Sequence, residues 1–122
     1  MAAEDVELRE LIGWVRITAK ACGWDITAAE NPANSNAVGP TFILDDGDRT
    51  IAVKLKTTAA YTSTENAKRG GLSKTQAEAR DRWSGEWHTW HPGALQEAFS
   101  VLAGGSRCLL GVPARSDEQR GR

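Results

Sequence analysis

The sequence predicts an α/β fold: a small mixed central sheet flanked by helices. Two runs rich in β-branched and aromatic residues, 41–44 and 50–56, enclose an Asp/Gly cluster, which is the pattern of a β-hairpin. Before them, residues 4–22 repeat apolar side chains at steps of three and four, the spacing of an amphipathic helix. A hairpin is not stable alone in water, so we expect this helix to cover its apolar face. That face consists of Ile51, Val53 and Leu55.

The segments around the hairpin are read from their turn signals. Gly23 ends the first helix, and residues 24–28 have the composition of a short strand. Residues 30–36 are rich in Asn, Ser and Pro, which predicts a loop. Residues 57–71 carry a single aromatic residue and end in two glycines, so we expect a second, longer loop there.

The second half of the chain contains two further helices. Ser73 and Gln76 have the spacing of a capping box, which starts a helix that ends near Trp83. Residues 87–90 alternate as a strand, and residues 94–102 form the last helix. The inward side chains of that last helix are expected to be Leu95, Ala98, Phe99 and Leu102.

Composition and length indicate one globular domain. The chain has 122 residues, of which 40% are hydrophobic and 25% are charged, as in ordinary soluble proteins. No apolar run reaches the roughly 20 residues of a membrane span, and the acidic N-terminal stretch does not have the pattern of a secretory signal. We therefore expect a cytoplasmic protein with no membrane partner. The domain should cover residues 1–112, with an edge strand at 107–112 and a disordered tail at 113–122.

Cys22 and Cys108 are the two cysteines of the chain. They lie in apolar surroundings and have no CxxC spacing, so buried thiols are favoured over a disulfide.

Charge is distributed unevenly along the chain. The net charge of −1 argues against a protein that coats nucleic acid along its whole surface. Between residues 49 and 74, however, six basic residues face one acidic residue, Glu65. A local basic patch of this kind suits contact with a phosphate backbone, although a solvated loop with chance charge has the same composition. The six are Arg49, Lys54, Lys56, Lys68, Arg69 and Lys74.

Several short motifs share one order along the chain. Gly39-Pro40 opens the first hairpin strand, Leu55-Lys56 closes the second, and Leu72-Ser73 with Gln76 starts a helix. With Trp90 and Pro92 near the end, this order resembles the PD-(D/E)XK nucleases, and more closely their small phage and viral VRR-NUC branch. The resemblance covers about residues 6–103. It implies a restriction-endonuclease-like αβββαβ core and an origin in a phage or mobile element.

The resemblance also implies a chemistry, and this chain departs from it. The family holds Mg²⁺ or Mn²⁺ with two acids, whose positions here are Thr41 and Lys54. Lys56 and Gln76 occupy the family's other catalytic positions. Lys54 and Lys56 are two apart on one strand and point to one face, where a phosphate could sit between them.

These departures lead to the first functional hypothesis, a DNA-binding pseudoenzyme of nuclease descent that needs no cofactor. Its nucleic-acid-binding residues are expected to be Lys54, Lys56, Lys68, Arg69 and Lys74.

Two other hypotheses remain open. An active Mg²⁺- or Mn²⁺-dependent endonuclease would need relocated carboxylates. The candidates are Glu7 on the first helix and Asp45, beside Asp46 and Asp48, in the hairpin turn; a first-turn acid and ordinary turn residues explain them equally well. A phage module that binds a host protein in the host cytoplasm would use an exposed tryptophan as anchor. The candidates for that anchor are Trp83, Trp87 and Trp90.

Overall fold

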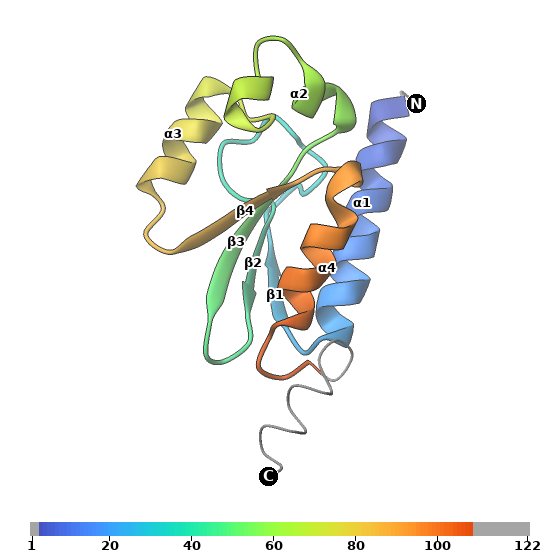
Figure 1. The fold of residues 1–122 in the computed structure, drawn as a ribbon, viewed down its shortest axis with the longest axis vertical. Coiled ribbons are helices and arrows are strands. Elements are labelled where there is room, and N and C mark those ends of the chain that lie inside the picture. Colours follow the sequence, from blue (N-terminus) through green and yellow to red (C-terminus); the bar gives the residue numbers. More distant parts are fainter. Residues whose placement is uncertain (1–2, 109–122) are drawn as a thin grey trace.

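A four-stranded sheet forms the centre of the computed structural model, which describes residues 3–108 (Figure 1). The strands lie in the order β1 (Asp25–Ala28), β2 (Phe42–Asp45), β3 (Thr50–Leu55) and β4 (Glu86–Trp90). β2 is antiparallel to both of its neighbours, β1 and β3, whereas β4 runs parallel to β3. The predicted small mixed sheet flanked by helices is therefore confirmed.

Helices lie on both sides of the sheet. Figure 1 shows α1 and α4 together on one side and α3, which belongs to the connection from β3 to β4, on the other. The helical elements are α1 (Ala3–Ala21), α2 (Thr58–Thr62), the 3-10 turn η1 (Ala67–Arg69), α3 (Lys74–Arg82), the 3-10 turn η2 (Pro92–Ala94) and α4 (Leu95–Ala103).

The hydrophobic core lies between the sheet and the layer formed by the two helices α1 and α4 (the α1–α4 layer). In the β2–β3 hairpin, Phe42 pairs with Val53 and Leu44 pairs with Ile51, so these apolar side chains share one face. The predicted hairpin and its covering helix are confirmed. From the two helices, the core receives Leu8, Leu11, Val15, Ala19, Ala98 and Leu102.

The inward face of α4 is narrower than predicted. Ala98 and Leu102, one turn apart, are buried, but Leu95 and Phe99 are 37% and 39% exposed. The prediction that these two point inward is therefore wrong. Because α4 lies beside α1 in the same layer, only one stripe of its surface meets the core.

The segment 57–71, predicted to be a loop, is folded. The Thr57 hydroxyl caps α2 by accepting a hydrogen bond from Ala60 N at 3.1 Å. Tyr61 stacks on His91 with ring centroids 3.7 Å apart, and a Cβ at Gly71 would lie 3.0 Å from the Tyr61 backbone. The Tyr61–His91 contact holds the segment 57–71 against the turn that follows β4.

The C-terminal expectations lie largely outside the described residues. Arg107 and Cys108 are not in a strand; residues 109–112 of the expected edge strand and the expected tail at 113–122 are not described. Among the helices of residues 3–108, none is both long and apolar enough to cross a membrane.

Candidate functional site

Two lysines form the centre of the candidate site, Lys54 in β3 and Lys56 directly after it, on the side of the sheet opposite the core. Lys54 Nζ donates hydrogen bonds to the carbonyl oxygens of Ala37 and Gly39 at 2.6 and 2.9 Å. Lys56 Nζ donates to Ser35 O at 2.9 Å and Gln76 Oε1 at 3.0 Å. Lys54 is 1% exposed and Lys56 is 4% exposed. The expectation that both would be open to a phosphate must be corrected, because the loop 35–39 covers their ammonium groups.

Gln76 links the lysines to α3. Its Nε2 donates to Ser35 O at 2.8 Å and to Ala37 O at 2.9 Å. Its Oε1 accepts from Lys56 and from Ser73 N, the latter at 2.9 Å, which completes the predicted capping box. All the hydrogen-bonding capacity of this amide is therefore used. The structure thus brings together Lys56 and Gln76, the two residues at the family's other catalytic positions.

The electrostatics of the lysine pair are unusual. In the part of the chain that the structure describes, no ion pair includes either ammonium group. Burial, and secondarily the charge of Lys56, lowers the pKa of Lys54 to about 8. Burial also lowers the pKa of Lys56. Each ammonium group has three N–H donors, of which two are used here. In the described residues all four acceptors are neutral oxygens, so the positive charge of the site is not compensated by a carboxylate.

The site does not fit a divalent metal. Thr41 is buried where the start of β2 meets the end of β3, and its hydroxyl accepts a hydrogen bond from Leu55 N at 3.0 Å. Lys54 places a positive charge against the carbonyls of Ala37 and Gly39, where it would repel a cation. Mg²⁺ and Mn²⁺ require oxygen ligands, usually carboxylates, and neither position supplies one.

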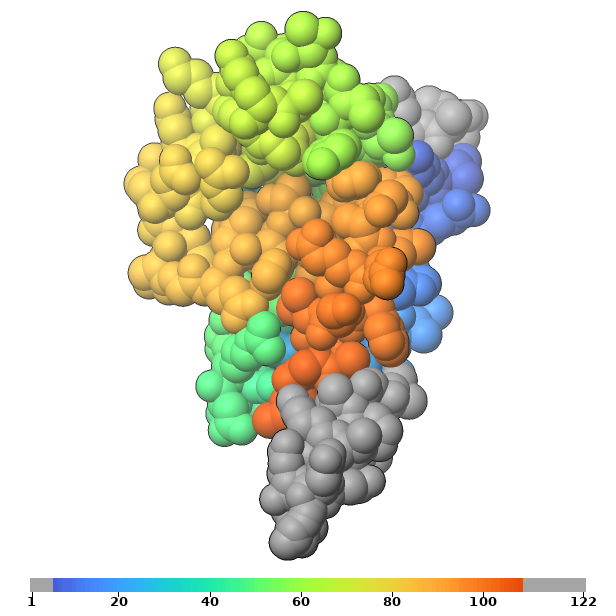
Figure 2. Space-filling model, viewed as in Figure 1, coloured from blue at the N-terminus to red at the C-terminus, as the bar shows by residue number. Residues whose placement is uncertain are grey.

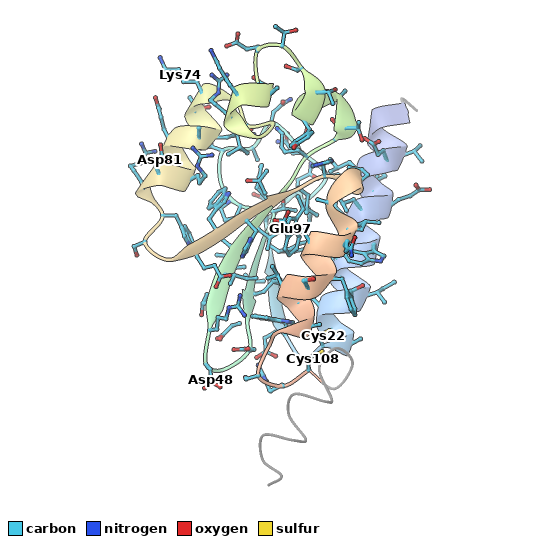
Figure 3. The ribbon with its side chains drawn as sticks, viewed as in Figure 1. Cys22, Asp48, Lys74, Asp81, Glu97 and Cys108 are labelled. Carbon is cyan, nitrogen blue, oxygen red and sulfur yellow. The ribbon has the colours of Figure 1, made fainter. Side chains whose placement is uncertain are left out.

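The alternative metal candidates are engaged elsewhere. Glu7 accepts hydrogen bonds from Thr58 N and Thr58 Oγ1, both at 2.9 Å, and so joins α1 to α2. Asp45 accepts from Gly47 N at 2.9 Å within the hairpin turn. Figure 3 shows Asp48 at the tip of this hairpin, at the opposite end of the molecule from Lys74. Within residues 3–108, no group of three or more His, Cys, Asp or Glu side chains could hold a metal ion.

Asp46 has a structural role that its sequence context did not reveal. It is buried, and its carboxylate accepts hydrogen bonds from Asp48 N, Arg49 N and Ser106 N at 2.7 to 2.9 Å. Burial raises its pKa, but these hydrogen bonds outweigh burial and lower the pKa overall. Asp46 thus ties the hairpin turn to the segment after α4, a contact between positions that no local pattern connects.

The remaining basic residues separate into two groups. Lys68 in η1 and Lys74 at the start of α3 are exposed, and they lie in the segments that lead to Gln76. Arg69 is held by Glu65, Asn66 and the carbonyl of Leu72 at 3.1 to 3.3 Å.

Arg49 belongs to a different environment, at the start of β3. It forms a bidentate pair with Glu86 at 2.7 and 2.8 Å, and His88 contacts the same carboxylate at 2.6 Å. The hydrogen bond from Arg49, followed by that from His88, lowers the pKa of Glu86 to about 2. Arg49 is therefore committed to this network and not to the basic patch.

The tryptophans proposed as anchors differ in exposure. Trp90 is fully buried in the core and cannot anchor a partner, which corrects that expectation. Trp83 and Trp87 are half-buried and pack edge to face, with centroids 6.1 Å apart.

Backbone carbonyls of the loop 35–39 are the functional groups that the sequence did not indicate. The oxygens of Ser35, Ala37 and Gly39 accept hydrogen bonds from the two lysines, yet nothing in these residue types signals that role.

In comparisons with known proteins, no family model, no curated protein and no solved structure matches this chain.

Proposed function

We propose that this protein is a nuclease-related DNA-binding domain that does not cleave DNA. The observation that carries the proposal is the buried pair of Lys54 in β3 and Lys56 directly after it, whose ammonium groups contact only neutral oxygens within residues 3–108. Two positive charges of this kind, shielded from water, produce a positive potential at the adjoining surface. A polyanion is the complementary partner for such a surface.

Loss of cleavage is the second part of the proposal. The resemblance places the metal-binding acids at Thr41 and Lys54, and the hydrogen bonds that both side chains make here support the loss of that role. The ammonium of Lys54 lies among carbonyl oxygens and supplies a positive charge at neutral pH in place of a cation. The domain would therefore keep attraction for a phosphodiester and lose the means to activate water.

Direct phosphate contacts are assigned to Lys68 and Lys74. Both are exposed and precede Gln76 in the chain, and Figure 3 shows Lys74 at the N-terminal end of α3. Arg69 holds the η1 turn in place through its own hydrogen bonds. In this conformation Lys54 and Lys56 act from behind the surface, and a phosphate reaches them only if the loop 35–39 moves.

Fluorescence anisotropy with a labelled DNA duplex, measured across a salt series, tests the binding. Two phosphate contacts should give a log–log slope of affinity against salt of about −2. Lys68→Ala or Lys74→Ala should weaken binding on all sequences and flatten that slope by about one unit. Lys20 is exposed in the last turn of α1. Lys20→Ala removes the same charge and should leave the slope unchanged. Undetectable binding at low salt, or equal effects of Lys68→Ala and Lys20→Ala, would refute the proposal.

Cleavage is tested separately with Mg²⁺ or Mn²⁺ and both duplex and single-stranded DNA. No product above the buffer control is expected. Robust cleavage that disappears in Glu7→Ala or Asp45→Ala would instead establish relocated carboxylates.

A double substitution tests the correspondence with the nuclease site. Thr41→Asp combined with Lys54→Glu should create divalent-cation binding measurable by calorimetry, once circular dichroism shows that the variant is folded. Thr41→Asp alone keeps the repelling ammonium and is the matched control, for which no binding is expected. A folded double variant without cation binding would count against the correspondence.

The second candidate function is protein binding, favoured by an apolar groove between α1 and the α4 region. Leu11, Trp14, Pro92 and Leu95 line it, and Glu7 and Glu10 add negative charge. Val6 and Phe99, on the same helices, are exposed, and Figure 2 shows the outer surface of α4 open to solvent. This combination of apolar and acidic groups fits a basic amphipathic helix of a partner protein.

Calorimetry with a designed helical peptide, leucines on one face and lysines on the other, tests this second candidate. Leu95→Glu should abolish binding, whereas Ile17→Glu, at an exposed apolar position of α1 outside the groove, should not. Equal loss in both variants would indicate non-specific attachment.

A further inference from the structure

The two cysteines meet although they lie far apart in the sequence. Cys22 follows the C-terminal end of α1, and Cys108 follows the turn after α4; Figure 3 shows them side by side. A side-chain hydrogen bond joins the two thiols. Cys22 is fully buried, whereas Cys108 is half-buried, so the sequence prediction of buried thiols holds for Cys22 and only partly for Cys108.

The backbone around the pair is tightly packed. A Cβ at Gly23 would lie 2.8 Å from Cβ of Arg107. The residue after Cys22 and the residue before Cys108 are therefore in direct contact. Trp24 Nε1 donates to Leu102 O at 2.9 Å, and a Cβ at Gly105 would lie 2.9 Å from the Trp24 ring. These contacts hold the end of α1 and the segment after α4 in a fixed relative position.

We propose that Cys22 and Cys108 are a redox-active pair that forms a reversible intramolecular disulfide when the protein meets a peroxide. Hydrogen-bonded thiols need a movement of only about 1–2 Å to reach disulfide bonding distance. The surrounding contacts keep the two sulfur atoms together, which favours the intramolecular bond over a bond between molecules.

The order of events follows from accessibility. The pKa of Cys22 is raised to about 12, chiefly by burial and secondarily by the hydrogen bond to Cys108 and the charge of Cys108. Cys22 therefore stays a thiol at neutral pH. Cys108 is the more exposed of the two residues, and its thiol is therefore assigned as the one that meets the oxidant. Cys22 then acts as the resolving thiol.

The reaction balances in two steps. The thiolate of Cys108 attacks one oxygen of hydrogen peroxide; an S–O bond forms, the O–O bond breaks, and the leaving oxygen departs as water after protonation. The sulfur of Cys22 then attacks the sulfenic sulfur of Cys108; the S–S bond forms, the S–O bond breaks, and a second water leaves with the thiol proton. In total, two thiols lose two electrons to one peroxide.

The disulfide would join the residue that follows α1 to the last described residue, and so close a loop that contains most of the described chain. Closing a loop of this length removes much of the freedom of the unfolded chain, so the oxidised protein should be more resistant to unfolding. The bond lies at the end of α1 remote from Lys68 and Lys74, and it therefore makes no demand on the proposed DNA surface.

The test is intact-mass spectrometry of the full chain before and after treatment with hydrogen peroxide in dilute solution. The wild type should lose two hydrogen atoms, keep the mass of a single chain and yield one peptide in which Cys22 is linked to Cys108. Dithiothreitol should reverse the change. The melting temperature of the oxidised protein should exceed that of the reduced protein by roughly 5–15 °C.

Cys22→Ala and Cys108→Ala are the matched variants, and circular dichroism checks their folding. In Cys22→Ala, Cys108 should take up oxygen and form no internal bond, and Cys108→Ala should be unreactive under the same treatment. Oxygen addition at Cys108 or a dimer as the wild-type product would overturn the proposal. So would a linked wild-type product whose melting temperature does not rise. Peptide mapping of the wild type keeps the test decisive even if a variant fails to fold.

Discussion

The two faces of β3 are buried to the same degree but by different interactions. On one face, Ile51, Val53 and Leu55 pack against the α1–α4 layer. On the other, Lys54 and Lys56 are covered by the loop 35–39 and by Gln76. The first face gains free energy by removing apolar surface from water. The second must offset the cost of desolvating two charges with hydrogen bonds.

Alternation along a strand therefore predicts on which face of the sheet a side chain lies, but not whether that face is exposed to water. The pattern of β3 correctly separates the two sets of side chains. Whether the polar set meets water depends on a distant loop, and here that loop closes over it. A face stabilised by hydrogen bonds to charged groups should respond to pH, whereas the apolar face should not.

Truncation of the apolar face should have the largest effect. We expect Leu55→Ala to lower the free energy of unfolding by about 3 kcal/mol, since it removes a fully buried side chain and leaves a cavity. Leu95→Ala, at a partly exposed site, should cost less than about 1 kcal/mol. Urea unfolding measures both values. Equal losses would contradict the packing described for α4.

Breaking the polar face at Gln76 should cost slightly less. Gln76→Leu should lower the free energy of unfolding by about 2 kcal/mol, because Ser73 N and Lys56 lose an acceptor and two loop carbonyls lose a donor. Gln96→Leu on the exposed surface of α4 is the control and should change little. If the two variants unfold alike, the network around Gln76 does not stabilise the loop.

Lys54→Met should reveal the desolvation of the lysine pair through pH. The pKa of Lys54 is about 8 in the folded protein, against an ordinary value of 10.5. Between these two pH values, Lys54 has lost its proton in the folded protein but still carries it in the unfolded chain. Wild-type stability should therefore rise with pH across this window, by about 1 kcal/mol per pH unit above pH 8. Lys56 adds in the same direction, whereas Cys22, with its raised pKa, opposes it at alkaline pH.

The comparison of wild type with Lys54→Met isolates the Lys54 contribution, because Cys22 is common to both proteins. Urea unfolding at pH 7, 8 and 9 should show curves that diverge above pH 8. Parallel curves would mean that Lys54 titrates normally despite its burial.

The smallest effect is expected at the edge of the sheet. Glu86→Gln should lower stability at neutral pH by less than about 1 kcal/mol, because its pair with Arg49 is partly exposed to solvent. The depressed pKa means that this contribution is present above the ordinary value of 4.5 and is lost as pH falls toward 2. Wild type and variant should therefore converge in acid unfolding experiments, with exposed Glu97→Gln as the control. A difference that persists at pH 2 would exclude the ion pair as its cause.

Local patterns determined the elements of this fold. The hairpin, the covering helix and the capping box at Ser73 and Gln76 were all readable because each depends on side chains a few positions apart. The side of the sheet on which Ile51 and its neighbours lie was equally readable, since strand geometry alternates side chains.

Tertiary structure decided what each side chain meets. Lys54 and Lys56 are interior because carbonyls of residues 35–39 fold over them, and the exposed side of α4 follows from its place beside α1. Asp46 with Ser106, and Cys22 with Cys108, are contacts between distant segments. Burial and partner choice depend on how whole elements pack, and backbone carbonyls carry no signature in the residue type. The sequence therefore specified the chemistry that was present, and only the packed fold specified which groups act on one another.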